Sequence, residues 1–326
     1  MDPLSDVLSL LKIQSYSAGG FPVAGDLAIQ FPKHQGIKCY AVLSGQCWLS
    51  LEGISDPLLL TAGDCFLLPR GRPFSLSTKL SLTPVDYRVL LEALKNGDAA
   101  APHKGREHYI AGGHFALSGG HADILLNSLP PIVHIRKESD KAAMRWSLER
   151  MREELRNPQP GGSLIAQQLA YMMLIQALRL HLADEARSGV GWLFALADKQ
   201  MSAAIACMHD NPGHCWTLQE LAGRVGMSRS IFALKFKETV GKTPMEYLTR
   251  WRMMLAGDKL KTREESISEI AVSLGYESES AFGKAFKRVM GCSPRQYGRH
   301  ESTLRPRSLA AKEDRYEHPM ELTAVR

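Results

Sequence analysis

The strongest constraint on the fold is a repeat of about fifty residues in the C-terminal third of the chain. Ala222 and Gly226 recur as Ala271 and Gly275 at an offset of 49. An offset of 50 relates the next positions, which are Phe232, Phe236, Gly241, Pro244 and Tyr247 in the first copy and Phe282, Phe286, Gly291, Pro294 and Tyr297 in the second. Self-similarity at a fixed period is typical of duplicated supersecondary units. The sequence therefore predicts an all-α domain over residues 199–300 that contains one helical unit twice.

Each copy has the residues that two helices and a tight turn between them require. In the first copy Thr217 and Ser228 are good N-caps, and Gly226 can adopt the positive φ of a turn. Phe232 and Phe236 lie four residues apart and predict a buried side, which leaves the opposite side of that helix to solvent. The pattern predicts two helix-turn-helix motifs, and the connecting helix in WRMMLAGDKLKT can place their second helices in successive major grooves.

The net charge of +6 is confined to the same segment. Residues 199–300 carry 16 Lys and Arg against 10 Asp and Glu, whereas residues 1–198 carry 19 against 19 and residues 301–326 carry 5 against 5. Neutralisation of phosphates by basic side chains supplies much of the affinity of proteins for DNA. A basic helical segment beside a neutral one predicts double-stranded DNA as a partner, with solvated surface charge as the alternative.

Composition indicates a folded, multidomain protein. The chain has 326 residues, of which 44% are hydrophobic and 23% charged, so two or three domains with sizeable cores are expected. No segment is long and apolar enough for a membrane span, and MDPLSDVLSLL lacks the features of a secretory signal, so a cytoplasmic location without a membrane partner is expected. Six scattered cysteines without a CxxC pair favour reduced thiols, and a thiol-based sensor is the alternative.

Residues 1–135 contain short apolar runs separated by Gly and Pro, which predicts a β-sandwich or barrel. Small barrels hold one small ligand in an apolar interior, so a small-molecule effector is an expected partner. The side chains expected to line such a pocket are Cys39, Trp48, Phe66 and Phe74, with a purely structural core as the alternative.

Residues 136–187 have a helical pattern. The stretch SLIAQQLAYMMLIQALRLHLADEA is apolar nearly all round, so the helix must bury both sides. A homodimer contact through residues 164–182 and a fully intramolecular core helix are weighed equally. Residues 188–198 are predicted to be a linker, and residues 301–326 a solvated tail.

GIKCYAVLSGQCWLSL followed by LTAGDCFLLPRGRPF resembles the cupin, or small jelly-roll, sensor domains of bacterial regulators over roughly residues 20–130. The resemblance implies metal-ligand positions, but Lys38-Cys39-Tyr40 stands where metal-binding cupins have a His-x-His pair, and Phe74 stands where they have a further histidine. No metal, cofactor or catalytic residue is therefore expected. A ligand set assembled from the other histidines of this segment is left open; these are His103, His108, His114, His121 and His134.

GMSRSIF, GKTPMEYLTRWRM and AVSLGYESESAFGKAFKRVMGCSPRQY resemble the DNA-binding domain of AraC/XylS-family transcriptional regulators, and WTLQELAGRVGMSRS resembles members with a cupin sensor. The expected fold class is α+β multidomain, with a cupin barrel, a helical dimerisation segment and two helix-turn-helix motifs. The implied function is signal-responsive, sequence-specific transcription regulation without enzymatic activity, with RNA polymerase as a partner if the protein activates. The alternatives are a metal-dependent cupin enzyme fused to a DNA-binding module and a sequence-neutral DNA binder.

The family resemblance also implies which residues contact DNA. Those matching base-reading positions are Ser230, Ala233, Leu234, Glu279, Ser280 and Lys284. The expected phosphate contacts are Ser228, Arg229, Lys237, Ser278, Lys287 and Arg288. Leu234 stands where many members have Arg, so it cannot make a bidentate guanine contact. Most base discrimination is therefore expected from the second helix-turn-helix motif.

Overall fold

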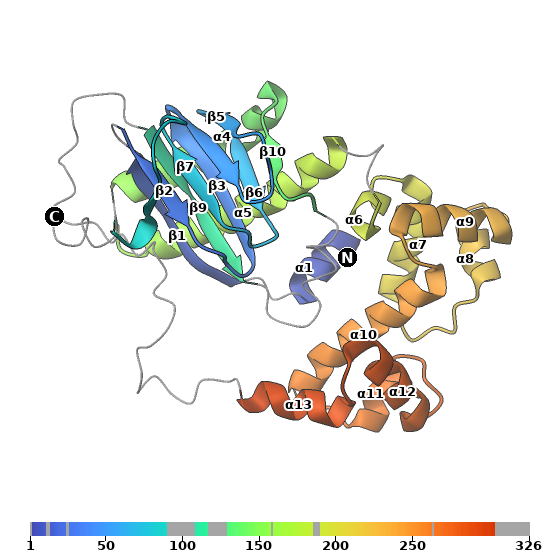
Figure 1. Cartoon of the computed structure of the whole chain (residues 1–326). Coiled ribbons are helices and arrows are strands. Elements are labelled where there is room, and N and C mark those ends of the chain that lie inside the picture. Colours follow the sequence, from blue (N-terminus) through green and yellow to red (C-terminus); the bar gives the residue numbers. More distant parts are fainter. Residues whose placement is uncertain are drawn as a thin grey trace. The chain divides into compact units, whose positions relative to one another are not determined.

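The computed structural model describes residues 2–10, 14–23, 26–89, 108–116, 129–157, 159–184, 190–262 and 264–303. These residues form two compact units, each of which is considered by itself (Figure 1). The sandwich unit contains the described residues from 14 to 184. The helical unit contains residues 2–10 together with those from 190 to 303. Among the described residues, no helix has the length and apolar character needed to span a membrane.

The sandwich unit consists of two five-stranded sheets (Figure 1). The first has the order β1 (Gln14–Val23), β9 (His108–Ala116), β3 (Ile37–Ser44), β6 (Cys65–Leu68) and β10 (Val133–Ile135). The second has the order β5 (Leu58–Thr61), β4 (Gln46–Leu51), β7 (Phe74–Ser77), β2 (Ala28–Phe31) and β8 (Val85–Asp86). Pairing is antiparallel except between β2 and β8.

An apolar core fills the space between the two sheets. In β4, Cys47, Leu49 and Leu51 are buried and alternate with less buried residues, as expected for a strand with one face on the core. Phe66 of β6 and Phe74 of β7 meet in this core with side chains of both sheets. The sequence prediction of a cupin-type sandwich rests on this alternation and on the glycine turns between the strands.

Two helices follow the strands, α4 (Glu138–Arg156) and α5 (Gly162–Asp184). Helix α5 packs on the outer face of the first sheet, where a Cβ atom on Gly113 of β9 would lie 2.9 Å from the Cβ of Ala170. Most of its apolar residues are buried within the chain, whereas Leu164 and Ile165 at its start are 64% and 41% exposed. Much of the burial that the all-round apolar pattern requires is therefore intramolecular.

The helical unit contains nine helices among the described residues. They are α1 (Pro3–Leu10), α6 (Trp192–Ala195), α7 (Lys199–Asp210), α8 (Leu218–Arg224), α9 (Arg229–Val240), α10 (Pro244–Thr262), α11 (Ile267–Ser273), α12 (Glu279–Met290) and α13 (Pro294–Thr303), with α10 long enough to serve both halves. All four residues of α6 are buried, and the amide of Gly191 donates to the carbonyl of Thr239. The predicted linker over 188–198 is corrected accordingly, because its apolar residues 192–195 pack into the helical unit. Of the predicted tail over 301–326, the residues after Thr303 lie outside the described part of the chain.

Two pairs of these nine helices are built alike. In the first pair, α8 and α9 are joined through Gly226 (φ 68°); in the second, α11 and α12 are joined through Gly275 (φ 78°). Ser228 and Ser278 cap the second helix of each pair by accepting hydrogen bonds from the backbone three residues on. The local signals of the repeat therefore produce the same backbone twice.

The aromatic cores of the two pairs also correspond. The ring centroids of Phe232 and Phe236 lie 5.6 Å apart, and those of Phe282 and Phe286 also lie 5.6 Å apart. Tyr247 and Tyr297 extend the two clusters at 5.8 Å and 5.5 Å from the second phenylalanine of each. All four phenylalanines are fully buried, so each pair is held by its own small apolar core.

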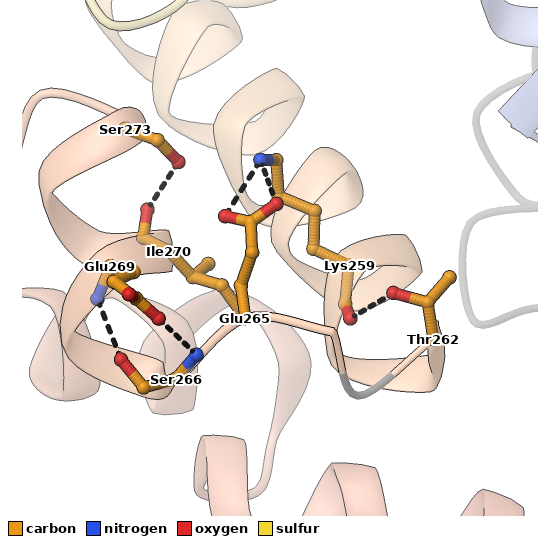
Figure 2. A network of polar contacts seen from close by, with 7 residues as sticks. All are labelled: Lys259, Thr262, Glu265, Ser266, Glu269, Ile270 and Ser273. Atoms are coloured by element: carbon orange, nitrogen blue, oxygen red, sulfur yellow. Dashed lines mark hydrogen bonds and ion pairs between the residues drawn. The ribbon is translucent and has the colours of Figure 1, made fainter.

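The joint between α10 and α11 is fixed by polar contacts (Figure 2). The ammonium of Lys259 lies 2.6 Å and 3.0 Å from the two carboxylate oxygens of Glu265. Ser266 and Glu269 form a capping box, in which each side chain accepts from the other residue's backbone amide. Helix α11 therefore begins at a defined residue and in a defined direction relative to α10.

Helix α1 belongs to the helical unit although it precedes the sandwich in sequence. It packs against α7 and α10 and buries Leu4, Val7 and Leu8. Nδ1 of His209 on α7 lies 3.2 Å from a carboxylate oxygen of Asp6, and Nε2 lies 2.8 Å from the hydroxyl of Tyr247. The His209 ring stacks on Trp251 at 3.7 Å between centroids. In a neutral ring, Nδ1–H donates to Asp6, so Nε2 accepts from the tyrosine hydroxyl.

Acidification is expected to loosen the contact between α1, α7 and α10. Burial lowers the pKa of His209 to about 3. The His209 imidazole is protonated near pH 6.5 in the unfolded chain but stays neutral in the folded chain. The contribution of the neutral ring to the free energy of unfolding is therefore fully present above pH 6.5 and falls as the pH drops towards 3. At pH 5 the expected loss is about 2 kcal/mol. This loss is measured by hydrogen exchange of the α7 amides at pH 7.5 and pH 5, with the exchange rates corrected for their intrinsic pH dependence. His209→Gln should abolish most of the difference, and an unchanged difference would contradict the assignment.

Candidate nucleic-acid interface

Helix α9 presents one side of its surface to solvent. Its capping and aromatic residues hold the other side against the domain, so Arg229, Ser230, Leu234 and Lys237 are exposed and Ala233 is half-buried. The most exposed large apolar side chains of this helix are Leu234 at 61% and Ile231 at 60%. Two such neighbours on a basic helix make an apolar strip that can contact thymine methyl groups. Ile231 was not among the predicted contacts, although its exposure follows from the spacing of the buried phenylalanines.

Helix α12 presents the corresponding side with different chemistry. The predicted contact residues Glu279, Ser280, Lys284, Lys287 and Arg288 are exposed on it, as is Ala281. Ala281 and Lys284 occupy the positions that Ile231 and Leu234 occupy on α9, so the second helix has a cation where the first has an apolar strip. The structure therefore brings the predicted base and phosphate candidates of each copy onto one exposed helix side.

Ser228 and Ser278 lie at the N-termini of these two helices. The Oγ atom of Ser228 accepts from the amide of Ile231 at 3.4 Å, and that of Ser278 accepts from the amide of Ala281 at 3.2 Å. Each hydroxyl retains its own O–H as a donor. Both serines can therefore cap a helix and still donate to a phosphate oxygen.

Arg295 is a functional candidate that the sequence reasoning did not include. Its guanidinium lies 3.4 Å from the carboxylate of Glu279, and both side chains are largely exposed. It stands in the first turn of α13, whose N-cap Ser293 bonds to the neutral amide oxygen of Gln296. In the first copy the position equivalent to Gln296 holds a carboxylate, Glu246, which accepts hydrogen bonds from the capping residue Thr243. The start of α13 is therefore more positive than the start of α10, a difference visible in the aligned repeat.

Arg252 of α10 connects the two halves of the helical unit. Its Nε donates to the carbonyl of Pro212 at 2.6 Å, and Nη2 donates to the carbonyl of His214 at 2.8 Å. The same guanidinium lies 5.7 Å from the ring centroid of Tyr276. The loop before α8 is thereby held to the turn between α11 and α12; we call these contacts the Arg252 bridge.

The backbones of this loop and this turn also approach each other closely. A Cβ atom on Gly213 would lie 2.6 Å from the carbonyl oxygen of Ser273, and one on Gly275 would overlap the carbonyl of Gly213. Contact at this distance is possible only without side chains. The loop and the turn therefore fix the orientation of the second helix pair relative to the first.

The predicted pocket residues do not lie together. Phe66 and Phe74 are in the core between the sheets. Cys39 pairs with Gly113 and faces α5 on the opposite side of the first sheet, and Trp48 lies on the outer side of β4. The expectation for Cys39 and Trp48 is corrected because successive strand residues point to opposite faces. Sequence reasoning also missed Lys38, which pairs with the core residue Leu68 and therefore faces the core.

The remaining histidines of this segment are only partly described. His134 Nε2 lies 3.1 Å from a carboxylate oxygen of Asp64, and His114 Nε2 bonds to the carbonyl of Gln35. Within the described ranges, no three His, Cys, Asp or Glu side chains are placed to hold a metal ion. His103 and His121, two members of the histidine set left open above, lie outside the described residues.

Comparisons with known proteins agree with this two-part organisation. Residues 2–183 match the family model described as cupin, and residues 221–300 match the model described as helix-turn-helix domain. The chain is 40% identical over 301 residues to an AraC-like transcription regulator of Streptomyces lividans, which covers 92% of this chain and 99% of that protein.

More distant relatives cover the same length or the helical part. The transcriptional regulator AlkR of Acinetobacter baylyi is 29% identical over 310 residues, covering 91% of this chain and 99% of the relative. Among solved structures, the DNA-binding domain of AdpA in complex with a target DNA is 28% identical, covers 32% of this chain and 95% of its own, and gives a TM-score of 0.31.

Proposed function

Because the chain belongs to the AraC-like DNA-binding transcription regulators with a cupin N-terminal domain, we propose that it recognises DNA through two helix-turn-helix motifs, α8–α9 and α11–α12. The observation that carries this proposal is the pair of corresponding exposed sides on α9 and α12. Helices α9 and α12 then enter successive major grooves on one side of the DNA, about 34 Å apart. The Arg252 bridge keeps their spacing constant.

The two recognition helices make different contacts with the bases. On α12, Lys284 donates to guanine O6 and N7, Ser280 contacts a base edge, and Glu279 accepts from cytosine N4. On α9, Leu234 and Ile231 contact thymine methyl groups, and Ser230 and Ala233 lie beside them. The exposure of these side chains supports this assignment, and most discrimination between sequences comes from α12.

Phosphate contacts surround both helices. Arg229 and Lys237 flank the apolar strip of α9, whereas Lys287 and Arg288 lie in the last turns of α12. Arg295 adds a cation at the start of α13, where the backbone amides and the helix dipole also favour an anion. Such contacts orient the protein on DNA without reading its sequence.

Two lysines of α12 test the division between base and phosphate contacts. Lys284→Ala is expected to cost about 1–3 kcal/mol of binding free energy on the target site and to relax the preference at one base pair. Lys287→Ala should weaken binding to target and random DNA equally. It should also reduce the slope of log affinity against log salt concentration by about 1 in magnitude. The target site comes from mapping bound sites across the host genome, and fluorescence anisotropy against a panel of single-base variants provides the measurement.

The two variants are matched, because both remove one exposed lysine from the same helix. Identical behaviour of the two variants across the DNA panel would refute the assigned roles. Equal affinity of the unchanged protein for target and random DNA at physiological salt would instead refute sequence-specific regulation and support a sequence-neutral binder.

The proposal includes three partners besides DNA. A small-molecule effector binds the cupin domain, and its binding changes how the recognition helices are presented. A homodimer forms through the start of α5, where Leu164 and Ile165 are exposed, and Trp146 of α4 is also 64% exposed. RNA polymerase is a partner if the protein activates transcription.

A further inference from the structure

Lys38 is a buried cation inside the sandwich. It is 6% exposed and lies on β3 directly opposite Leu68 of β6 and His114 of β9. Directly paired residues share a face of the sheet, and Leu68 belongs to the core between the sheets. The Lys38 side chain therefore points into the interior of the sandwich at the end where β3 begins.

Aromatic rings surround the Lys38 ammonium. Its Nζ atom lies 4.9 Å from the ring centroids of both Phe31 and Phe74, which stack on each other at 4.5 Å, and 6.0 Å from that of Tyr40. Within the described part of the chain, no carboxylate forms an ion pair with it. Cation–π contacts offset only part of the cost of removing an ammonium from water. Among the described residues, this site therefore has a positive charge without a compensating anion.

His34 adds a second unsatisfied group beside this cation. Its Nε2 lies 3.3 Å from the carbonyl of Leu68 and its ring packs on Phe74, whereas Nδ1 is buried without a hydrogen-bond partner in the described residues. Burial, followed by the nearby Lys38 charge, lowers the pKa of His34 to about 3. Burial lowers the pKa of Lys38 to about 8, so most of its ammonium remains charged at pH 7. Buried polar atoms without partners are rare and call for an explanation.

We propose that Lys38 binds the carboxylate of a small organic acid whose apolar body lies among the aromatic side chains of the sandwich. The carboxylate supplies an anion for the Lys38 ammonium, which has none among the described residues, and a ring or short chain contacts Phe31 and Phe74. An uncharged compound of the same shape leaves the buried ammonium unpaired and binds less well. This inference deepens the proposed function, because it names the class of effector that the cupin domain takes.

Calorimetric titration of the full-length protein with benzoate and benzamide tests the inference. Benzoate is expected to bind at least about tenfold more tightly than benzamide, which corresponds to about 1.4 kcal/mol. Lys38→Met should reduce benzoate to the affinity of benzamide. Lys33→Met is the matched control, because it removes an exposed lysine five residues away and should leave the preference for benzoate unchanged.

Each result decides one question. Equal affinity of the unchanged protein for benzoate and benzamide overturns the inference even if Lys38→Met fails to fold, and so does a preference for benzoate that survives in Lys38→Met. Target-site affinity is measured in parallel without any acid. Loss of specific DNA binding there refutes the proposed regulation, whereas intact DNA binding without a benzoate preference refutes only the carboxylate site.

Discussion

Gly275→Ala is expected to destabilise the helical unit by about 1–3 kcal/mol more than Gly226→Ala. The two glycines occupy equivalent turns and have φ angles of 78° and 68°, so alanine strains both by about 1–2 kcal/mol. A Cβ on Gly226 would meet no atom within 4 Å among the described residues. One on Gly275 would overlap the carbonyl of Gly213 and approach Nη2 of Arg252 to 3.0 Å, and relieving such overlap costs about 1–3 kcal/mol more.

Thermal unfolding and hydrogen exchange of α11 and α12 measure this difference. Gly226→Ala provides the control for backbone strain, since it changes the same turn position without the backbone contact. Equal losses in the two variants would show that the loop at Gly213 does not pack on the second turn in solution. The contact between the two halves would then have no part in stability.

Arg252→Ala is expected to lower affinity for the complete target site by about tenfold, or 1.4 kcal/mol, while leaving affinity for DNA with only one half-site nearly unchanged. The variant removes two hydrogen bonds from a charged donor to the carbonyls of Pro212 and His214. The two recognition helices then lose their fixed spacing, and binding both grooves must restore it. Fluorescence anisotropy on whole and half sites gives the two affinities.

Arg250→Ala is the matched control for the charge. Arg250 lies on the same helix and is half-buried, and none of the contacts of the Arg252 bridge involves it. One base pair inserted between the half-sites should impair the unchanged protein more than Arg252→Ala, because a loose connection tolerates altered spacing. Retention of the full spacing requirement in Arg252→Ala would contradict a positioning role.

The sequence allowed the repeated helices to be predicted because their signals are local. Serine caps, glycine turns and phenylalanines four residues apart act within a single helix pair, so the exposed sides of α9 and α12 follow from spacing alone. The contact between Gly213 and Gly275 is different. Both glycines indicate turns, but their proximity depends on how α10 orients the two pairs, which no local pattern encodes.

The interior of the sandwich was harder to predict for another reason. Strand β3 is buried on both faces over most of its length, so it lacks the alternation that would assign Cys39 to one side and Lys38 to the other. In the sequence, Lys38 was noted only as a residue that stands where metal-binding cupins have histidine. Register with Leu68 and His114 was needed to place this side chain in the core.

The position of α1 has a consequence for the connectivity of the whole chain. Because residues 2–10 and residues 190–303 belong to one unit, the sandwich is a domain inserted into a discontinuous helical domain. An inserted domain is tethered at both ends, so it cannot rotate about one peptide segment as a domain at a chain terminus can. A fragment that begins after the sandwich would therefore lack helix α1, which is part of the domain that the fragment was meant to isolate.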